Sequence, residues 1–331
     1  MTTLRKAMKE KLMAEIEFIA SQSVYPLSQF LTMMLHGYQI DNVVFIIEGL
    51  KSNRSLEELL RTADPLGRFP ELKNIQPIEG DDYASLYQNV LIDLPVGVYF
   101  RKFLNEVTSA AQADDGAEID TKFIAEAMAD YSLQQIQLRV RKIWLNEFYD
   151  FCQTQMNETT ASVMGDMLNF EADMQAIQII SNSLIYGGNA AGRDNERKKY
   201  MSKIGYLYPD YSMRLDSVSD FNSLILALDG SGYEEMLKQV ANTDQRNEAE
   251  SSGATIDEVM LVAASRKYSQ GFESGFHAGC FYAYLKLKEQ EIGNVTWLAE
   301  LVQMNVSRNM SGWNKYVSPF MYHRNDMAFK E

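Results

Sequence analysis

The chain has 331 residues, 46% of them hydrophobic and 11% aromatic, which is enough apolar material for a large core and excludes a disordered protein. Its 45 acidic residues outnumber 31 lysines and arginines, and the formal net charge of −14 argues against binding of nucleic acid or anionic lipid by a basic face. No stretch approaches the roughly 18 apolar residues of a membrane span, and charges recur where a secretory signal would be apolar. Two cysteines cannot form a multi-bridge framework, so we expect a reduced, cytosolic setting.

Apolar residues at helical spacing recur along the whole chain. Three stripes with intervals of three or four residues are Leu4, Met8, Leu12, Ile16 and Ile19; Ile136, Val140, Ile143, Trp144, Phe148 and Phe151; and Phe170, Met174, Ile177, Ile180 and Leu184. No proline interrupts the chain between Pro95 and Pro209, and alternating strand-like runs joined by hairpin turns are missing. The sequence therefore predicts an all-α fold.

Clusters of turn residues divide these helices. They are Asp64–Gly80, Ala113–Gly116, Tyr186–Arg193, Tyr208–Asp210 and Asn242–Gly253. All are short enough to join packed helices and too short for flexible interdomain tethers. We expect a single domain over residues 1–331, with approximate lobes at 1–112, 113–245 and 246–331.

An internal repeat supports the lobes. Ile40–Glu48 aligns with Ile292–Glu300, and Met174–Ser181 fits the same frame. Upstream of the second and third copies, Glu171-x-Asp173 matches Glu289-x-Glu291. The repetition favours three related helical units, with coincidence of helical periodicity as the alternative.

The third copy lies in Phe281–Leu301, which has a charged belt, Lys286–Glu291, between apolar ends. We expect a helix that is buried at both ends and wet or partnered at its centre. Pairs at i,i+3, Lys286 with Glu289 and Lys288 with Glu291, would only solubilise a helix face. Alternatively, the acids line a cavity that grips a partner.

Residues that could carry catalysis or bind a metal are scarce. His36, His277 and His323 have no second ligand at metal spacing, and His277 is expected to be a hydrogen-bonded core residue of an aromatic helix, Phe272–Phe281. No G-x-S-x-G nucleophile motif is present. We expect no catalytic residue, no cofactor and no metal.

Two weaker motifs lead to the same expectation. Asp81-Asp82 and Asp114-Asp115 are similar to the paired aspartates of helical Mg²⁺-dependent prenyl-transforming enzymes, but neither has a further acid three residues on. Gly187–Arg193 has the glycine spacing of a phosphate loop and lacks its Lys-Ser/Thr. Solvated loop acids and a lobe connector are the favoured interpretations.

A long run near the end of the chain carries a specific resemblance. The residues Phe276-His277-x-Gly279-x-Phe281-Tyr282-Ala283-Tyr284-x-Lys286-Leu287-Lys288-Glu289-Gln290-Glu291, then Asn294, Trp297 and Ala299-Glu300, resemble the C-terminal signature of the d subunit family of eukaryotic V-type proton ATPases. Matches follow the family order from about residue 5 to residue 320: Tyr25-x-Leu27, Tyr38-x-Ile40-Asp41-Asn42-Val43, Pro65-Leu66-Gly67, Thr159-Thr160-Ala161, Phe170-Glu171-Ala172-Asp173, Gly205-x-Leu207-Tyr208-Pro209 and Tyr316–Phe320.

The resemblance implies a funnel-shaped body of three pseudo-repeated helical lobes that acts as a non-catalytic subunit of the membrane sector. Such a subunit caps the cytosolic side of the proteolipid c-ring and receives the central stalk, so that ATP hydrolysis elsewhere drives proton transport. The implied partners are the c-ring, stalk subunits D and F, and subunit a, without nucleic acid. The implied place is peripheral, on the cytosolic face of a vacuolar, endolysosomal or other acidic-organelle membrane. A helical adaptor of the same fold acting outside the pump is the alternative.

Four acids are the candidate partner contacts: Glu171, Asp173, Glu289 and Glu291. Gly293 and Met174-Gln175 stand where the family tends to have basic residues, so ion pairs from those positions to the four acids are not expected. Family members usually carry a further helical segment before the point that matches Arg5, so we expect a first lobe that is either naturally short or incompletely represented in this sequence. The tail Met321–Glu331 extends past the usual end and has no assigned role.

Overall fold

The computed structural model describes residues 3–75, 94–111, 131–186, 197, 199–238 and 256–305. Within these ranges the regular structure is helical and contains no strand, which confirms the all-α prediction. The chain divides into two compact units, Lys9–Phe151 and Thr2–Met8 with Cys152–Glu331. The three-lobe subdivision stays a prediction.

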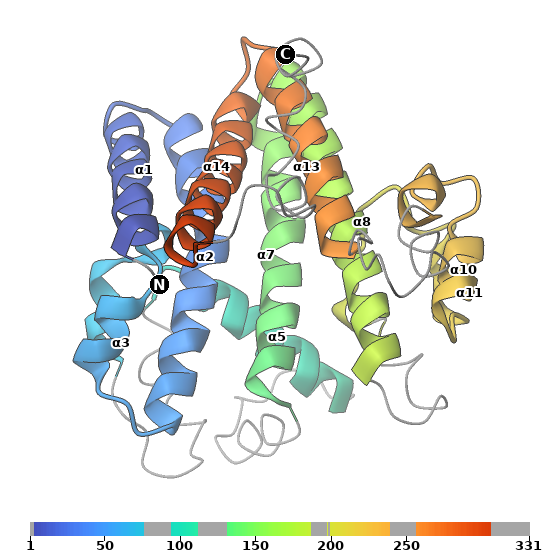
Figure 1. Ribbon diagram of the computed structural model, residues 1–331, viewed down its shortest axis with the longest axis horizontal. Coiled ribbons are helices and arrows are strands. Elements are labelled where there is room, and N and C mark those ends of the chain that lie inside the picture. Colours follow the sequence, from blue (N-terminus) through green and yellow to red (C-terminus); the bar gives the residue numbers. More distant parts are fainter. Residues whose placement is uncertain are drawn as a thin grey trace. The chain divides into compact units, whose positions relative to one another are not determined.

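The first unit is built mainly from long helices (Figure 1). Its elements are α1 (Thr3–Ser21), α2 (Leu27–Lys51), α3 (Leu56–Thr62), 3-10 helices at Pro65–Gly67 and Pro70–Asn74, α5 (Gly97–Ala111) and most of α7 (Leu133–Gln155). The first residues of α1, up to Met8, are grouped with the second unit. The predicted stripe of α7 is buried at Val140, Trp144 and Phe148. Trp144 stacks on Phe148 and donates a 2.8 Å hydrogen bond from Nε1 to the carbonyl of Met33 in α2.

Helix α2 is the central apolar element of this unit, and it corrects one expectation. By length and mean hydropathy it is apolar enough to cross a membrane, although no such stretch was expected from the sequence. Scattered polar residues such as Gln39 and Asn42 break its apolar run without lowering the average below that of a span. Because 78% of its most apolar window is buried within the protein, α2 is best described as a core helix.

His36 is a buried polar group on α2. Its Nδ1 lies 2.7 Å from the hydroxyl of Tyr99 in α5. Burial disfavours the imidazolium and lowers the pKa of His36 to about 4. The ring is therefore neutral at physiological pH.

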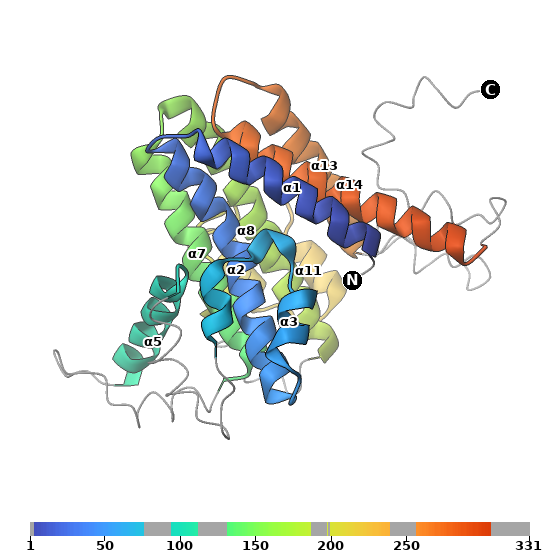
Figure 2. The same ribbon diagram turned by 90° about the vertical axis from the view of Figure 1, so that its left-hand side faces the viewer.

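Helices α2 and α3 lie side by side (Figure 2). Two segments that resemble the d subunit family meet close to them, where α2 contacts the 3-10 helix Pro65–Gly67. The Asn42 side chain donates to the Asp64 carbonyl and accepts from its N–H, both at 2.9 Å. Asp64 caps the 3-10 helix through the Leu66 N–H and pairs with the buried Lys9. A Cβ at Gly67 would lie 2.1 Å from the carbonyl oxygen of Tyr38, so only glycine fits there.

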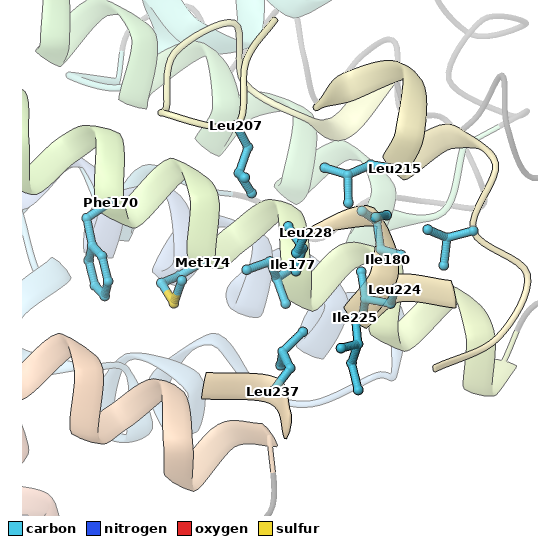
Figure 3. Close-up of a cluster of buried hydrophobic side chains, with 12 residues drawn as sticks. Phe170, Met174, Ile177, Ile180, Leu207, Leu215, Leu224, Ile225, Leu228 and Leu237 are labelled. Carbon is cyan, nitrogen blue, oxygen red and sulfur yellow. The ribbon is translucent and has the colours of Figure 1, made fainter. Parts of the chain in front are cut away.

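The second unit contains α8 (Glu158–Tyr186), α10 (Ser212–Asp216), α11 (Phe221–Ala227), α13 (Ile256–Glu273) and α14 (Gly279–Gln303). One face of α8 packs against the segment from Leu207 to Leu237 (Figure 3). Its buried side chains include four residues of the predicted apolar stripe, Phe170, Met174, Ile177 and Ile180. Asp220 begins α11 with a capping box that it shares with Ser223. This cluster fixes the 207–237 segment to one face of α8.

Helices α13 and α14 pack against each other and against α8. The predicted single helix Phe272–Phe281 is wrong, because α13 ends at Glu273 and α14 begins at Gly279. Between them Gly275 and Phe276 have left-handed backbones, with φ of 61° and 54°. His277 is buried and hydrogen-bonded to Ser274 at 2.7 Å, which confirms its expected character.

The ends of α14 differ in burial. Tyr282 and Leu285 near the start are buried, and so are Ile292 and Leu301 in the second half. Trp297, which was expected to be buried with them, is 40% exposed. The expectation that both ends are buried is therefore confirmed for the first end and for Leu301, and it is wrong for Trp297.

The three aligned segments of the internal repeat lie in α2, α8 and α14. Each of these helices follows another helix after a short turn, which is the arrangement that a repeated helix pair would give. Related units nevertheless stay a prediction. The aspartate pairs, the Gly187–Arg193 loop, the breaks at Ala113–Gly116 and Asn242–Gly253, His323, and the segments Tyr316–Phe320 and Met321–Glu331 lie outside the described residues.

Candidate functional site

Glu171 on α8 is buried beneath α13 and α14. Its Oε2 accepts a hydrogen bond from the Tyr282 hydroxyl of α14 and one from the Tyr268 hydroxyl of α13 at 3.4 Å. Its Oε1 lies 3.3 Å from Nζ of Lys286 on α14. One carboxylate thus joins three helices.

The Glu171–Lys286 pair is largely shielded from water, with side chains only 10% and 16% exposed. The ammonium also lies 5.2 Å from the centroid of the Tyr282 ring, within range of a cation–π interaction. Burial and the nearby Glu171 charge raise the pKa of Tyr268 well above its usual value, so this hydroxyl keeps its proton as a donor. A charged, multiply bonded group in this position fixes the relative placement of the helices.

Asp173 lies two residues further along α8 and has different neighbours. Its Oδ1 accepts from the Leu207 N–H at 3.0 Å, and Oδ2 accepts from the Tyr206 N–H at 3.0 Å and the Tyr233 hydroxyl at 2.8 Å. Burial raises the pKa of Asp173, and these three hydrogen bonds offset part of the rise. A Cβ at Gly205, where φ is +114°, would lie only 2.4 Å from Asp173 Oδ1.

Two further residues of α8 complete this contact and were missed in the sequence. Asn169 Oδ1 accepts from the Gly205 N–H at 3.0 Å, and Asp166 accepts from the Tyr206 hydroxyl and pairs with Lys267 of α13 at 2.5 Å. Positions 166, 169 and 173 share one helix face, a spacing that could have identified them as a set. Their partners on the 205–207 segment are mainly backbone groups, which leave no sequence signal apart from the glycine.

The other two candidate acids lie in the charged belt of α14. Glu291 is 47% exposed and pairs with Lys288 at 2.7 Å, which confirms that predicted i,i+3 pair. Glu289 is half-buried on the same helix. A Cβ at Gly293 would meet nothing within 4 Å, so the position expected to hold a basic residue in the family is open space here.

The structure therefore separates the four candidate acids into two groups. Glu171 and Asp173 are buried and bonded to their own chain, whereas Glu291 and, in part, Glu289 reach solvent. A partner-binding role for any of the four stays a prediction. Within the described ranges, no group of three or more His, Cys, Asp or Glu side chains is placed to hold a metal ion.

Comparison with protein families gives a match over residues 1–312 to the ATP synthase (C/AC39) subunit family. The chain belongs to this family. Its relatives include the V-type proton ATPase subunit d of Dictyostelium discoideum, which is 30% identical over 320 residues that cover 96% of this chain and 80% of the relative. The resemblance to the d subunit family is thereby confirmed.

Two further relatives match to a similar extent. A probable V-type proton ATPase subunit d of Oryza sativa subsp. japonica is 29% identical over 92% of this chain and 77% of its own length. The V-type proton ATPase subunit d of Saccharomyces cerevisiae is 28% identical over 94% of this chain and 79% of its own. These relatives are subunits of a pump by name, in agreement with the expectation of a non-catalytic subunit.

Proposed function

We propose that the chain is a non-catalytic subunit of a rotary V-type proton ATPase that couples the central stalk to the proteolipid ring. ATP hydrolysis on other subunits would then turn the ring and move protons into an acidic organelle. The proposed partners are the proteolipid c-ring, stalk subunits D and F, and membrane-sector subunit a. The chain would sit peripherally, on the cytosolic face of a vacuolar, endolysosomal or other acidic-organelle membrane, held by protein contacts.

The observation that carries this proposal is the bracing of α14. On its inner side, Lys286 and Tyr282 are bonded to Glu171 of α8. On its outer side, Lys288 and Glu291 remain accessible. A coupling subunit needs a surface that a partner can push against without moving its support, and close-packed helices transmit such strain with little compression.

Glu289 and Glu291 are the acids that we propose to contact the partner directly. Glu171 and Asp173 were predicted as contacts too, and we propose that they contribute from behind, by holding α14 and the 205–207 segment in place. A partner that meets the outer acids should present basic or polar groups, because opposite charges steer association and suppress wrong partners.

The test reverses the charge of both outer acids, Glu289→Lys with Glu291→Lys, in the pump of the cell that makes this chain. We expect ATP hydrolysis to continue while vesicle acidification falls several-fold, because the contact fails and the fold does not. The matched control reverses two exposed acids elsewhere in the same unit, Asp210→Lys with Glu235→Lys. Equal loss of acidification in both double variants would show that net charge, and not this contact, is responsible.

Two further measurements separate the alternatives. Purification of the chain in mild detergent should recover proteolipid and stalk subunits, and their consistent absence would favour an adaptor that acts outside the pump. Thermal unfolding of the Glu289→Lys, Glu291→Lys variant should match that of the wild type. A collapsed transition would mean that these acids are structural.

A further inference from the structure

The turn between α13 and α14 exposes an aromatic side chain completely. Phe276 has no surface covered by the rest of the chain, and Phe272, at the end of α13, is 46% exposed. A fully exposed Phe is unusual even though single apolar residues are common on surfaces. Its backbone is also unusual, because φ of 54° places a bulky residue in the left-handed region that glycine and asparagine prefer.

The turn is braced by hydrogen bonds on both sides of Phe276. Ser274 donates from Oγ to the Gly271 carbonyl at 2.9 Å and contacts Nε2 of the buried His277 at 2.7 Å. The Ala278 N–H donates to Oγ1 of Thr160 in α8 at 3.1 Å. The phenyl ring therefore projects from a rigid support, and a strained backbone that its surroundings enforce points to a function.

The surface around this turn continues into the charged belt of α14. Phe272 packs against Tyr284 with ring centroids 6.4 Å apart, and Nζ of Lys288 lies 5.9 Å from the Tyr284 ring. Tyr284, Lys288 and Glu291 are spaced at i, i+4 and i+7, which puts them on one face of the helix. An aromatic anchor bordered by accessible charges is the usual anatomy of a protein interface.

We propose, building on the proposed function, that Phe276 and Phe272 form an anchor that inserts into an apolar pocket on a neighbouring protein subunit of the pump. Glu273, exposed between the two rings in sequence, would face a basic group at the rim of that pocket. A bilayer surface fits less well, because Glu273 borders the anchor and the chain carries a net charge of −14.

The test replaces Phe276 by the photo-crosslinking residue p-benzoylphenylalanine in the full-length chain, in cells whose own copy is replaced by this variant. We expect irradiation to link position 276 to one other subunit of the purified pump. The same probe at Met213, a highly exposed side chain of the same unit, should give no such product. A pump that contains the chain but gives no link from position 276 would overturn the anchor and leave the coupling role intact. A chain that never co-purifies with the pump would overturn both.

A second variant measures the contribution of the ring without risking the fold. Phe276→Asn keeps a residue that tolerates the left-handed backbone, so its thermal transition should lie at or above that of the wild type. Rebinding to pump membranes stripped of this subunit should weaken about tenfold or more, whereas Met213→Asn should rebind normally. Unchanged rebinding of Phe276→Asn would refute the anchor. Flotation of the wild type, but not of Phe276→Asn, with vesicles of phosphatidylcholine and phosphatidylserine would overturn it by assigning the ring to a membrane instead.

Discussion

Replacing Gly205 by alanine should be among the most destabilising single changes in the second unit. The glycine has φ of +114°, a conformation that an L residue adopts only under strain. Its added Cβ would lie 2.4 Å from Asp173 Oδ1, where 3.4 Å is an ordinary contact, so about 1.0 Å of movement is required. A carboxylate displaced that far loses the 3.0 Å hydrogen bond from the Leu207 N–H.

These two effects set the magnitude. Backbone strain at a left-handed position costs about 1–3 kcal/mol. Loss of a hydrogen bond to a charged, buried group costs about 1.5–3 kcal/mol. We therefore expect Gly205→Ala to lower the free energy of unfolding by about 3–5 kcal/mol.

Urea denaturation of the purified chain, followed by far-UV circular dichroism, measures this loss. Two controls separate the clash from the strain. Gly232 has φ of +84° and a Cβ there would meet nothing within 4 Å, so Gly232→Ala reports strain alone and should cost about 1 kcal/mol. In an Asp173→Ala background the oxygen is gone, and Gly205→Ala should lose most of its extra cost. The reasoning is refuted if Gly205→Ala costs no more than Gly232→Ala, or costs the same with and without Asp173.

The remaining predictions concern the belt and a buried histidine. Lys286→Met should lower the free energy of unfolding by about 2–4 kcal/mol, because it leaves the Glu171 charge buried without its partner. Lys288→Met, on the exposed side of the belt, should change it by under about 0.5 kcal/mol. Equal effects of the two variants in urea denaturation would contradict the assignment of Lys286 to a buried pair and Lys288 to the surface. Burial lowers the pKa of His36 from 6.5 to about 4, so the contribution of the neutral ring to the free energy of unfolding is complete above pH 6.5. This contribution is lost as the pH falls toward 4, and the loss amounts to about 3 kcal/mol. His36→Gln should flatten the dependence of stability on pH between about pH 4 and pH 6.5. An unchanged slope would show that other groups cause this pH dependence.

The helices could be predicted from the sequence because burial repeats every three or four residues. The stripe from Ile136 to Phe148 and that from Phe170 to Ile180 are buried as their spacing indicates. The same spacing gave a wrong prediction at Phe272–Phe281, because aromatic residues continue at helical intervals through the turn between α13 and α14. Ser274 and Gly275 are the local sequence signal that α13 ends there.

The roles of the candidate acids could not be predicted in the same way. Glu171 and Asp173 share a helix and a charge, and only tertiary contacts distinguish them. The partners of Glu171 lie about a hundred residues away in sequence, at Tyr268 and Tyr282, and two of the three donors to Asp173 are backbone N–H groups. A sequence shows which side chains are acidic, but not which N–H groups the fold brings to them.

Of the two interpretations of the belt, the i,i+3 pairing is confirmed for Lys288 with Glu291, and the contact with a partner stays a prediction. Residues two apart on an α-helix are rotated by about 200° relative to each other, so charges at Lys286, Lys288, Glu289 and Glu291 must lie on both faces of the helix. Lys286 points inward to Glu171, and Lys288 with Glu291 points outward to solvent. The inner half can hold α14 only if it is buried, and the outer half can meet a partner only if it is not. A charge reversal at Lys286 should therefore be read in the stability of the chain, and one at Glu291 in the coupling of the pump.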